Sequence, residues 1–100
     1  MYVVLLTYTA PLEEVDYALP DHYAWLDRQF EAGNFLVSGR REPRTGGVII
    51  TRPMTRDHVI TIMETDPFVL RKLVHYEVIE FQATRTVPEL NACNEALARP

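Results

Sequence analysis

The chain has 100 residues, 47% of them hydrophobic, and a formal net charge of −4. A chain of this length can bury one hydrophobic core, so we expect a single domain. The acidic balance and the lack of a sustained basic run argue against a nucleic-acid partner. The single cysteine, Cys93, cannot form an internal disulfide, which fits the reducing environment of the cytoplasm. We therefore expect a cytoplasmic protein.

The first segment, Tyr2–Tyr8, is predicted to be a β-strand because β-branched and aromatic residues dominate it. It lacks the basic start of a signal peptide, Glu13 and Glu14 follow it closely, and no apolar run is long enough to span a bilayer. We expect no membrane association. Both faces of the strand are largely apolar, so both need covering: Tyr2, Val4, Leu6 and Tyr8 on one face, and Val3, Leu5 and Thr7 on the other.

The next element is predicted to be an amphipathic helix over Pro20–Gly33, reached through a connecting segment at Leu12–Ala18. Pro20 is tolerated in a first helical turn, and Gly33 is expected to end the helix in the left-handed conformation. Apolar residues recur every three or four positions and are expected to face the core: Leu19, Tyr23, Leu26 and Phe30. His22 lies one residue off this stripe, at the boundary between core and solvent, where a pocket can form.

Three further strands are indicated by β-rich or alternating patterns. Phe35–Arg40 and Gly47–Arg52 are predicted to pair as antiparallel strands, because the loop between them, Arg41–Thr45, is short. Val74–Thr84 alternates well enough to form the last strand. A weaker pattern from Pro88 predicts a terminal helix with three residues facing inward: Leu90, Cys93 and Leu97.

Two helical segments precede the last strand. Thr55–Glu64 is predicted to be a helix capped by Thr55, with an apolar face made of Val59, Ile62 and Met63. Asp66 followed by Pro67 is typical of a helix start, and predicts a short helix that runs to about Leu73 with Asp66 as its cap.

The order β-α-β-β-α-β predicts an α+β fold of the ferredoxin-like kind. Right-handed crossovers place both helices on one face of a four-stranded antiparallel sheet and leave the opposite face bare. An apolar sheet face of that size is unusual on a monomer. We therefore predict a homodimer that packs sheet against sheet, and the sequence leaves open whether dimers associate further.

Four motifs in this order resemble the YciI-like (YCII-related domain) family: D-H-Y-A-W-L-D-R-Q-F-E-A-G around His22, S-G-R at the end of the second strand, G-G-V-I-I, and T-D-P-F around Asp66. The resemblance runs from the first strand to about Gln82. It implies one domain over residues 1–100, with a core of about 1–84 and a tail at 85–100. The family has a ferredoxin-like fold and belongs with the dimeric α+β barrels, and muconolactone isomerases and dehalogenases of chlorinated lactones are among its relatives.

The resemblance also implies a site. The proposed active site of the family, a histidine and an aspartate, maps onto His22 and Asp66. Taken alone, His22 can equally be a helix residue without a task, and Asp66 can be only a helix cap. As a pair they suit proton transfer, because a carboxylate that accepts from one ring N–H leaves the other imidazole nitrogen free as a base.

Residues near the second strand are candidates for substrate binding. Arg40 follows Gly39, where a ligand can approach the backbone closely, and is the candidate for a substrate carboxylate. Ser38 and Tyr8 are expected near the same edge of the sheet. Many family members carry Gly-Pro where this chain has Gly39-Arg40, so the substrate end of the pocket differs. The histidines lack metal-ligand spacing and nucleotide-binding motifs are absent, so we expect neither a metal nor another cofactor.

Two functions follow from the sequence. The first is a cofactor-independent enzyme in which His22, oriented by Asp66, removes a proton next to a carbonyl or lactone, giving isomerisation or elimination. The second is a non-catalytic module that binds a small molecule or serves as a dimeric scaffold, since fold and function separate easily.

Overall fold

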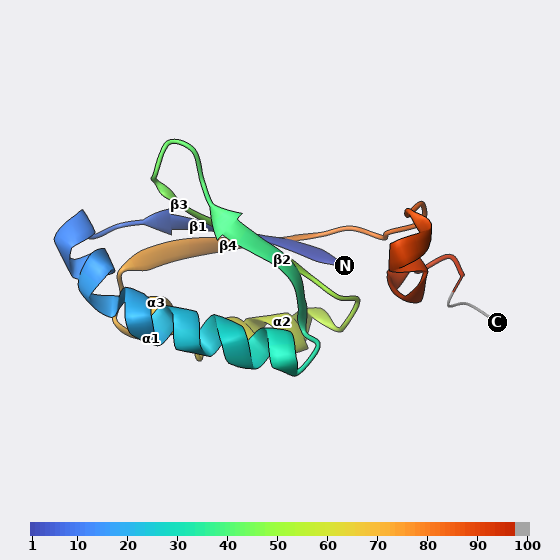
Figure 1. Cartoon of the computed structure of the whole chain (residues 1–100), viewed down its shortest axis with the longest axis horizontal. Coiled ribbons are helices and arrows are strands. Elements are labelled where there is room, and N and C mark those ends of the chain that lie inside the picture. The colour runs from blue at the N-terminus through green and yellow to red at the C-terminus, as the bar shows by residue number, and fades with distance from the viewer. Residues whose placement is uncertain (98–100) are drawn as a thin grey trace.

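A computed structural model describes residues 1–97 of the chain as a single sheet with helices below it (Figure 1). The elements follow in the order β1 (Tyr2–Tyr8), α1 (Leu12–Glu31), β2 (Phe35–Arg40), β3 (Gly46–Thr51), α2 (Arg56–Met63), α3 (Pro67–Leu70), β4 (Val74–Glu80) and a short 3₁₀ helix (Pro88–Cys93). All three helices labelled in Figure 1 lie on the same side of the sheet.

The sheet has the strand order β2-β3-β1-β4, and all neighbouring strands are antiparallel. Two crossovers, one through α1 and one through α2 and α3, produce this order. The α+β, ferredoxin-like fold predicted from the element order is therefore confirmed. Gly46 allows the close approach of β3 to β1, because a Cβ atom there would lie 1.7 Å from the Leu6 carbonyl oxygen.

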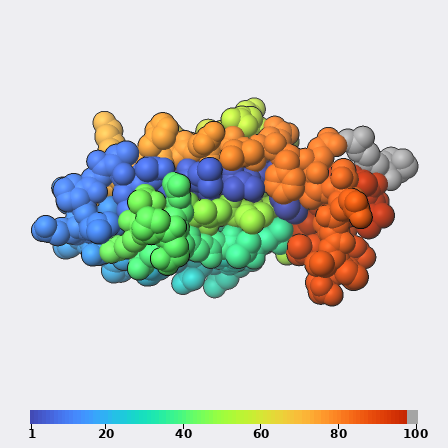
Figure 2. Space-filling view, turned by 90° about the horizontal axis from the view of Figure 1, so that it is seen from above, coloured from blue at the N-terminus to red at the C-terminus, as the bar shows by residue number. Residues whose placement is uncertain are grey.

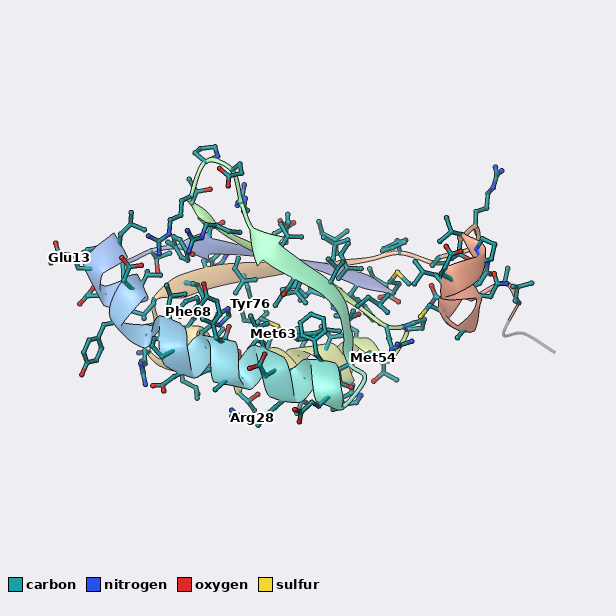
Figure 3. The ribbon with its side chains drawn as sticks, in the orientation of Figure 1. Glu13, Arg28, Met54, Met63, Phe68 and Tyr76 are labelled. Carbon is teal, nitrogen blue, oxygen red and sulfur yellow. The ribbon has the colours of Figure 1, made fainter. Side chains whose placement is uncertain are left out.

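The core lies between the helices and the lower face of the sheet. Its most deeply buried members come from both layers and include Val4, Trp25, Val59 and Met63. Figure 3 shows Met63 and Phe68 between the helical layer and the strands, whereas Arg28 points away from the sheet on the outer side of α1. The predicted apolar face of α2 is buried as expected, and Thr55 caps this helix by accepting from the His58 N–H.

Helix α1 differs from the prediction at its start. It begins at Leu12, so the expected connecting segment at Leu12–Ala18 is helical and Pro20 lies inside the helix. A proline there removes the N–H that would bond to the carbonyl of Asp16. Asp16 and Pro20 are both exposed, so water can hydrate that carbonyl and the helix continues. At the other end Gly33 adopts a φ of +77°, as predicted.

The buried face of α1 also differs from the predicted one. The residues that pack into the core are Val15, Ala18, His22 and Trp25. The predicted stripe is rotated by about one residue from this face, and two of its members, Tyr23 and Phe30, are exposed. The apolar stripe has another role, because it lines the pocket described below.

Other boundaries shift by a few residues. β3 begins one residue earlier than predicted, β4 ends at Glu80 instead of Thr84, and α3 ends at Leu70. The terminal helix is a 3₁₀ helix, and of its three predicted inward residues only Cys93 is buried. Cys93 packs with Met1 and Ala83 beyond the end of the sheet, where Figure 1 shows the C-terminal segment.

Within the described residues 1–97, no helix covers the upper face of the sheet. Figure 2 looks down on this face, with β4, β1 and β3 running side by side. The strand register aligns one apolar residue from each strand in a row across it: Val37, Ile50, Val3 and Ile79. Within residues 1–97, no helix is long and apolar enough to cross a membrane.

Candidate functional site

A pocket of about 350 Å³ lies between α1 and the lower face of β1, β2 and β3. This volume suits a compact small molecule, since ligand pockets start at about 300 Å³. The predicted apolar stripe of α1 forms one wall, and the strands form the opposite wall with Leu6 and Ile49. The polar and aromatic residues that line the pocket are Tyr8, His22, Tyr23, Asp27, Phe30, Ser38, Arg40 and Phe68.

His22 and Asp66 form a buried pair beside this pocket. The Nδ1 atom of His22 lies 2.8 Å from Oδ1 of Asp66, and the Asp66 side chain is fully buried. A carboxylate is an acceptor, so the neutral imidazole donates its Nδ1–H. The lone pair then lies on Nε2, and this nitrogen is the one that can take a proton.

Two aromatic rings hold the imidazole of His22. The Phe68 ring stacks on it with centroids 3.9 Å apart and an interplanar angle of 9°, and Trp25 stacks at 5.6 Å and 30°. Trp25 is itself fixed by a 2.8 Å hydrogen bond from its indole N–H to the Thr65 hydroxyl. The ring orientation of His22 is therefore set by packing as well as by the hydrogen bond to Asp66.

Asp66 also caps α3, so this residue makes the predicted cap and the contact with His22 at the same time. Its Oδ1 accepts from the Phe68 N–H at 2.9 Å as well as from His22. Its Oδ2 is buried and has no hydrogen-bond partner among residues 1–97. A carboxyl group shared in this way links the His22 ring to the start of α3.

The four predicted substrate-binding residues also line the pocket. Ser38, Gly39 and Arg40 come from β2, and Tyr8 ends β1. The other two histidines, His58 and His75, are exposed and do not line it. Within residues 1–97, no three His, Cys, Asp or Glu side chains are placed to hold a metal ion together.

An ion pair links α1 to the loop after β2 beside Tyr8, which lines the pocket. Arg44, in the loop after β2, donates a hydrogen bond to Asp16 on α1, and its guanidinium carbon lies 5.9 Å from the centre of the Tyr8 ring. The hydrogen bond from Arg44 lowers the pKa of Asp16, and the same bond raises the pKa of Arg44, with a smaller contribution from Tyr8. The Nε of Arg44 is buried without a partner in the described part of the chain.

Sequence reasoning missed three contributors to this site. Phe68 stacks on His22, and its only local signal was its position two residues after the Asp66 cap. Trp25 lies in the motif around His22 but was not singled out, and it packs on the imidazole. Asp16 was placed in a connecting segment, and the spacing of Val15, Ala18 and His22 was the signal that could have extended the helix to include it.

A comparison with protein families bears directly on this arrangement. The model of the YCII-related domain matches residues 1–82, which includes every strand and every residue of the pocket. The chain belongs to the YCII-related domain family. Membership agrees with the resemblance noted in the sequence and leaves the C-terminal segment outside the family model. Among curated proteins, no sequence matches this YCII-related chain.

A solved structure shares the fold of this YCII-related protein. It is the 5-chloro-2-hydroxyhydroquinone dehydrochlorinase from Burkholderia phenoliruptrix AC1100, in complex with 2,5-dihydroxybenzoquinone. The TM-score is 0.67 over 81% of this chain and 93% of that one, with 20% sequence identity. At this identity the likeness establishes a common fold.

Proposed function

We propose that this protein is a cofactor-independent enzyme of the lyase or isomerase type that acts on a small cyclic carbonyl, lactone or phenol. The observation that carries the proposal is the buried 2.8 Å contact between His22 and Asp66 at the side of an apolar pocket. The dehydrochlorinase with the same fold, which was solved with a dihydroxybenzoquinone, supports the reaction class and the ring-shaped ligand.

In the proposed reaction, Nε2 of His22 removes a proton from a carbon next to the substrate carbonyl. The electrons of the C–H bond form a C=C bond, and the carbonyl oxygen becomes an enolate. Return of the proton to another carbon gives isomerisation, whereas loss of chloride from the neighbouring carbon gives elimination of HCl. Asp66 stabilises the imidazolium that forms, because its carboxylate faces the newly charged ring across a buried hydrogen bond.

Arg40 is proposed to hold a carboxylate or another anionic group of the substrate. It lies on the exposed rim of the pocket, opposite the apolar wall of α1, and no side-chain hydrogen bond engages it within residues 1–97. A guanidinium can bind a carboxylate through two parallel hydrogen bonds. Ser38 and the backbone at Gly39 border the same end of the pocket.

We also propose that the protein forms a homodimer through the upper face of the sheet. The row of Val37, Ile50, Val3 and Ile79 crosses that face, and Val37 and Ile79 are 52% and 41% exposed in the single chain. Packing two such faces together would remove this apolar surface from water. The cytoplasmic location stays a prediction from the sequence.

Solvent deuterium incorporation tests the enzyme proposal across a panel of candidate substrates. Enolisable lactones, cyclic ketones and chlorinated hydroquinones are incubated with the protein in D₂O, and deuterium uptake and chloride release are measured. We expect at least one compound to exchange or lose chloride, and His22→Gln to abolish this activity. His58→Gln is the matched control, because His58 is exposed and outside the pocket.

The alternative function predicts a different pattern in the same experiment. Compounds that raise the melting temperature but are recovered unchanged and undeuterated would indicate a binding module. Equal exchange rates in His22→Gln and wild type would remove His22 from the mechanism.

A further inference from the structure

Proton abstraction by His22 leaves a negative charge on the substrate oxygen that has to be stabilised. Enzymes meet this need with a fixed hydrogen-bond donor aimed at the oxygen, and such donors contribute much of the rate. Four side chains that line the pocket carry a donor: Tyr8, Tyr23, Ser38 and Arg40. The contacts of these four residues distinguish them.

Tyr8 is held in place on the same aromatic wall as His22. Its ring packs edge-on against Phe68, with centroids 6.1 Å apart at an angle of 88°, and Phe68 stacks directly on His22. The ring of a bound ligand can therefore lie close to both Tyr8 and His22. Tyr23 also contacts the His22 ring, with centroids 6.1 Å apart, but its side chain is 49% exposed, whereas Tyr8 is half-buried. Within residues 1–97, no ring contact or side-chain hydrogen bond holds Ser38 or Arg40.

Arg44 places a positive charge beside the Tyr8 ring. The ion pair with Asp16 fixes the guanidinium between α1 and the loop after β2, within 5.9 Å of the centre of that ring. A positive charge near a phenol makes the phenol a stronger hydrogen-bond donor, because the cation stabilises the negative charge that builds up on the phenol oxygen.

We propose that Tyr8 is a catalytic residue that donates a hydrogen bond to the oxyanion of the substrate, and that Arg44, held by Asp16, is its positioning residue. This inference rests on the proposed function, because it assigns the second half of the same proton transfer. It also narrows the substrate class to ring compounds that present an ionisable oxygen, such as a phenol or a cyclic enol, at the Tyr8 end of the pocket.

The binding of nitrophenols tests this assignment without turnover. Ring-substituted nitrophenols of different acidity serve as probes, because the anion and the neutral phenol have different absorption spectra. Nitrobenzene serves as the uncharged probe of similar shape. We expect wild type to bind the phenolate form preferentially, and Tyr8→Phe to weaken phenolate binding by roughly tenfold or more while nitrobenzene binding is unchanged. Phenylalanine keeps the ring contact with Phe68 and removes only the hydroxyl.

Arg44 is tested against a neighbour of equal charge. Arg44→Gln is expected to weaken phenolate binding to a similar extent as Tyr8→Phe. Arg41→Gln removes the same charge from the same loop, but Arg41 donates to the Thr7 hydroxyl, and within residues 1–97 it makes no contact with the Tyr8 ring, so it is expected to leave binding unchanged. Circular dichroism confirms that each variant is folded before it is compared.

Three results would overturn the inference: no phenolate binding by wild type, unchanged binding in Tyr8→Phe, or equal losses in Arg44→Gln and Arg41→Gln. The proposed function fails separately, through deuterium incorporation that persists in His22→Gln. If exchange depends on His22 but phenolate binding ignores Tyr8, only the role of Tyr8 is rejected.

Discussion

Replacing Asp66 separates its two roles, because its contacts can be removed in different combinations. Asp66→Ala removes the cap of α3, which costs about 1 kcal/mol. It also leaves the buried His22 Nδ1–H without an acceptor, which costs about 1–3 kcal/mol. We therefore expect a loss of about 2–4 kcal/mol, or a fall of at least about 8 °C in melting temperature for a domain of this size.

Asp66→Asn keeps an oxygen acceptor where Oδ1 stands, so both donors stay satisfied and the expected loss of stability is about 1 kcal/mol. It removes the negative charge that stabilises the imidazolium, however. We expect deuterium incorporation to fall by roughly a hundredfold, equivalent to about 2.7 kcal/mol in the barrier. Asp66→Asn thus tests the negative charge of Asp66, and Asp66→Ala tests its role as a helix cap together with its contact with His22.

The assay pairs denaturation curves with deuterium incorporation at matched protein concentration. Thr55→Ala is the control for capping, because Thr55 caps α2 at an exposed position outside the pocket. The loss of unfolding free energy in Thr55→Ala measures the contribution of a helix cap alone. The additional loss of unfolding free energy in Asp66→Ala measures the contribution of the contact with His22. Wild-type exchange in Asp66→Asn, together with equal stability losses in Asp66→Ala and Thr55→Ala, would refute the paired role and leave Asp66 as a cap.

Three further predictions concern the fold. Gly46→Ala is expected to destabilise the fold by more than about 3 kcal/mol in thermal denaturation, because the new Cβ would lie 1.7 Å from a backbone oxygen. Gly39→Ala is the control and should be near neutral, because its Cβ would meet no atom within 4 Å. Val37→Glu should convert the proposed dimer to a folded monomer in light scattering, and a wild-type monomer at micromolar concentration would contradict the proposal of a dimer. Tyr76 titrates with a pKa raised to about 12 by burial and by its hydrogen bond to Glu64. The neutral phenol is favoured by folding, so its contribution to stability is present below pH 10 and declines towards pH 12, and denaturation of Tyr76→Phe should show a smaller alkaline loss than wild type.

Local signals in the sequence predicted most of the fold. Asp66 before Pro67 indicated a capped helix start, Gly33 indicated a helix end, and the apolar alternation indicated the strands. The start of α1 was missed because Pro20 was taken as the first turn, where proline is most common. In the folded chain Asp16 and Pro20 are both exposed, so water can hydrate the carbonyl of Asp16 and the helix continues through the proline. Tertiary packing of Val15 and Ala18 decided the outcome.

The site was predictable only in part, for a physical reason. His22 and Asp66 are 44 residues apart, and no local periodicity indicates a contact over that distance. The family resemblance supplied the pair, and the fold then brought the two side chains into hydrogen-bond distance. The contact of Arg44 with Asp16 and Tyr8 had no such support, because it joins a loop, a helix and a strand end through side-chain geometry alone.

The tautomer of His22 is the measurement that tests the central claim most directly. Two-bond ¹⁵N–¹H correlation spectra of the neutral imidazole show which ring nitrogen carries the proton, with no substrate required. The arrangement with Asp66 predicts a proton on Nδ1 and an unprotonated Nε2 ready to act as the base, and a disturbed signal in Asp66→Asn. A neutral His22 that carries its proton on Nε2 would contradict the proposed mechanism, because the nitrogen assigned to proton abstraction would already be occupied.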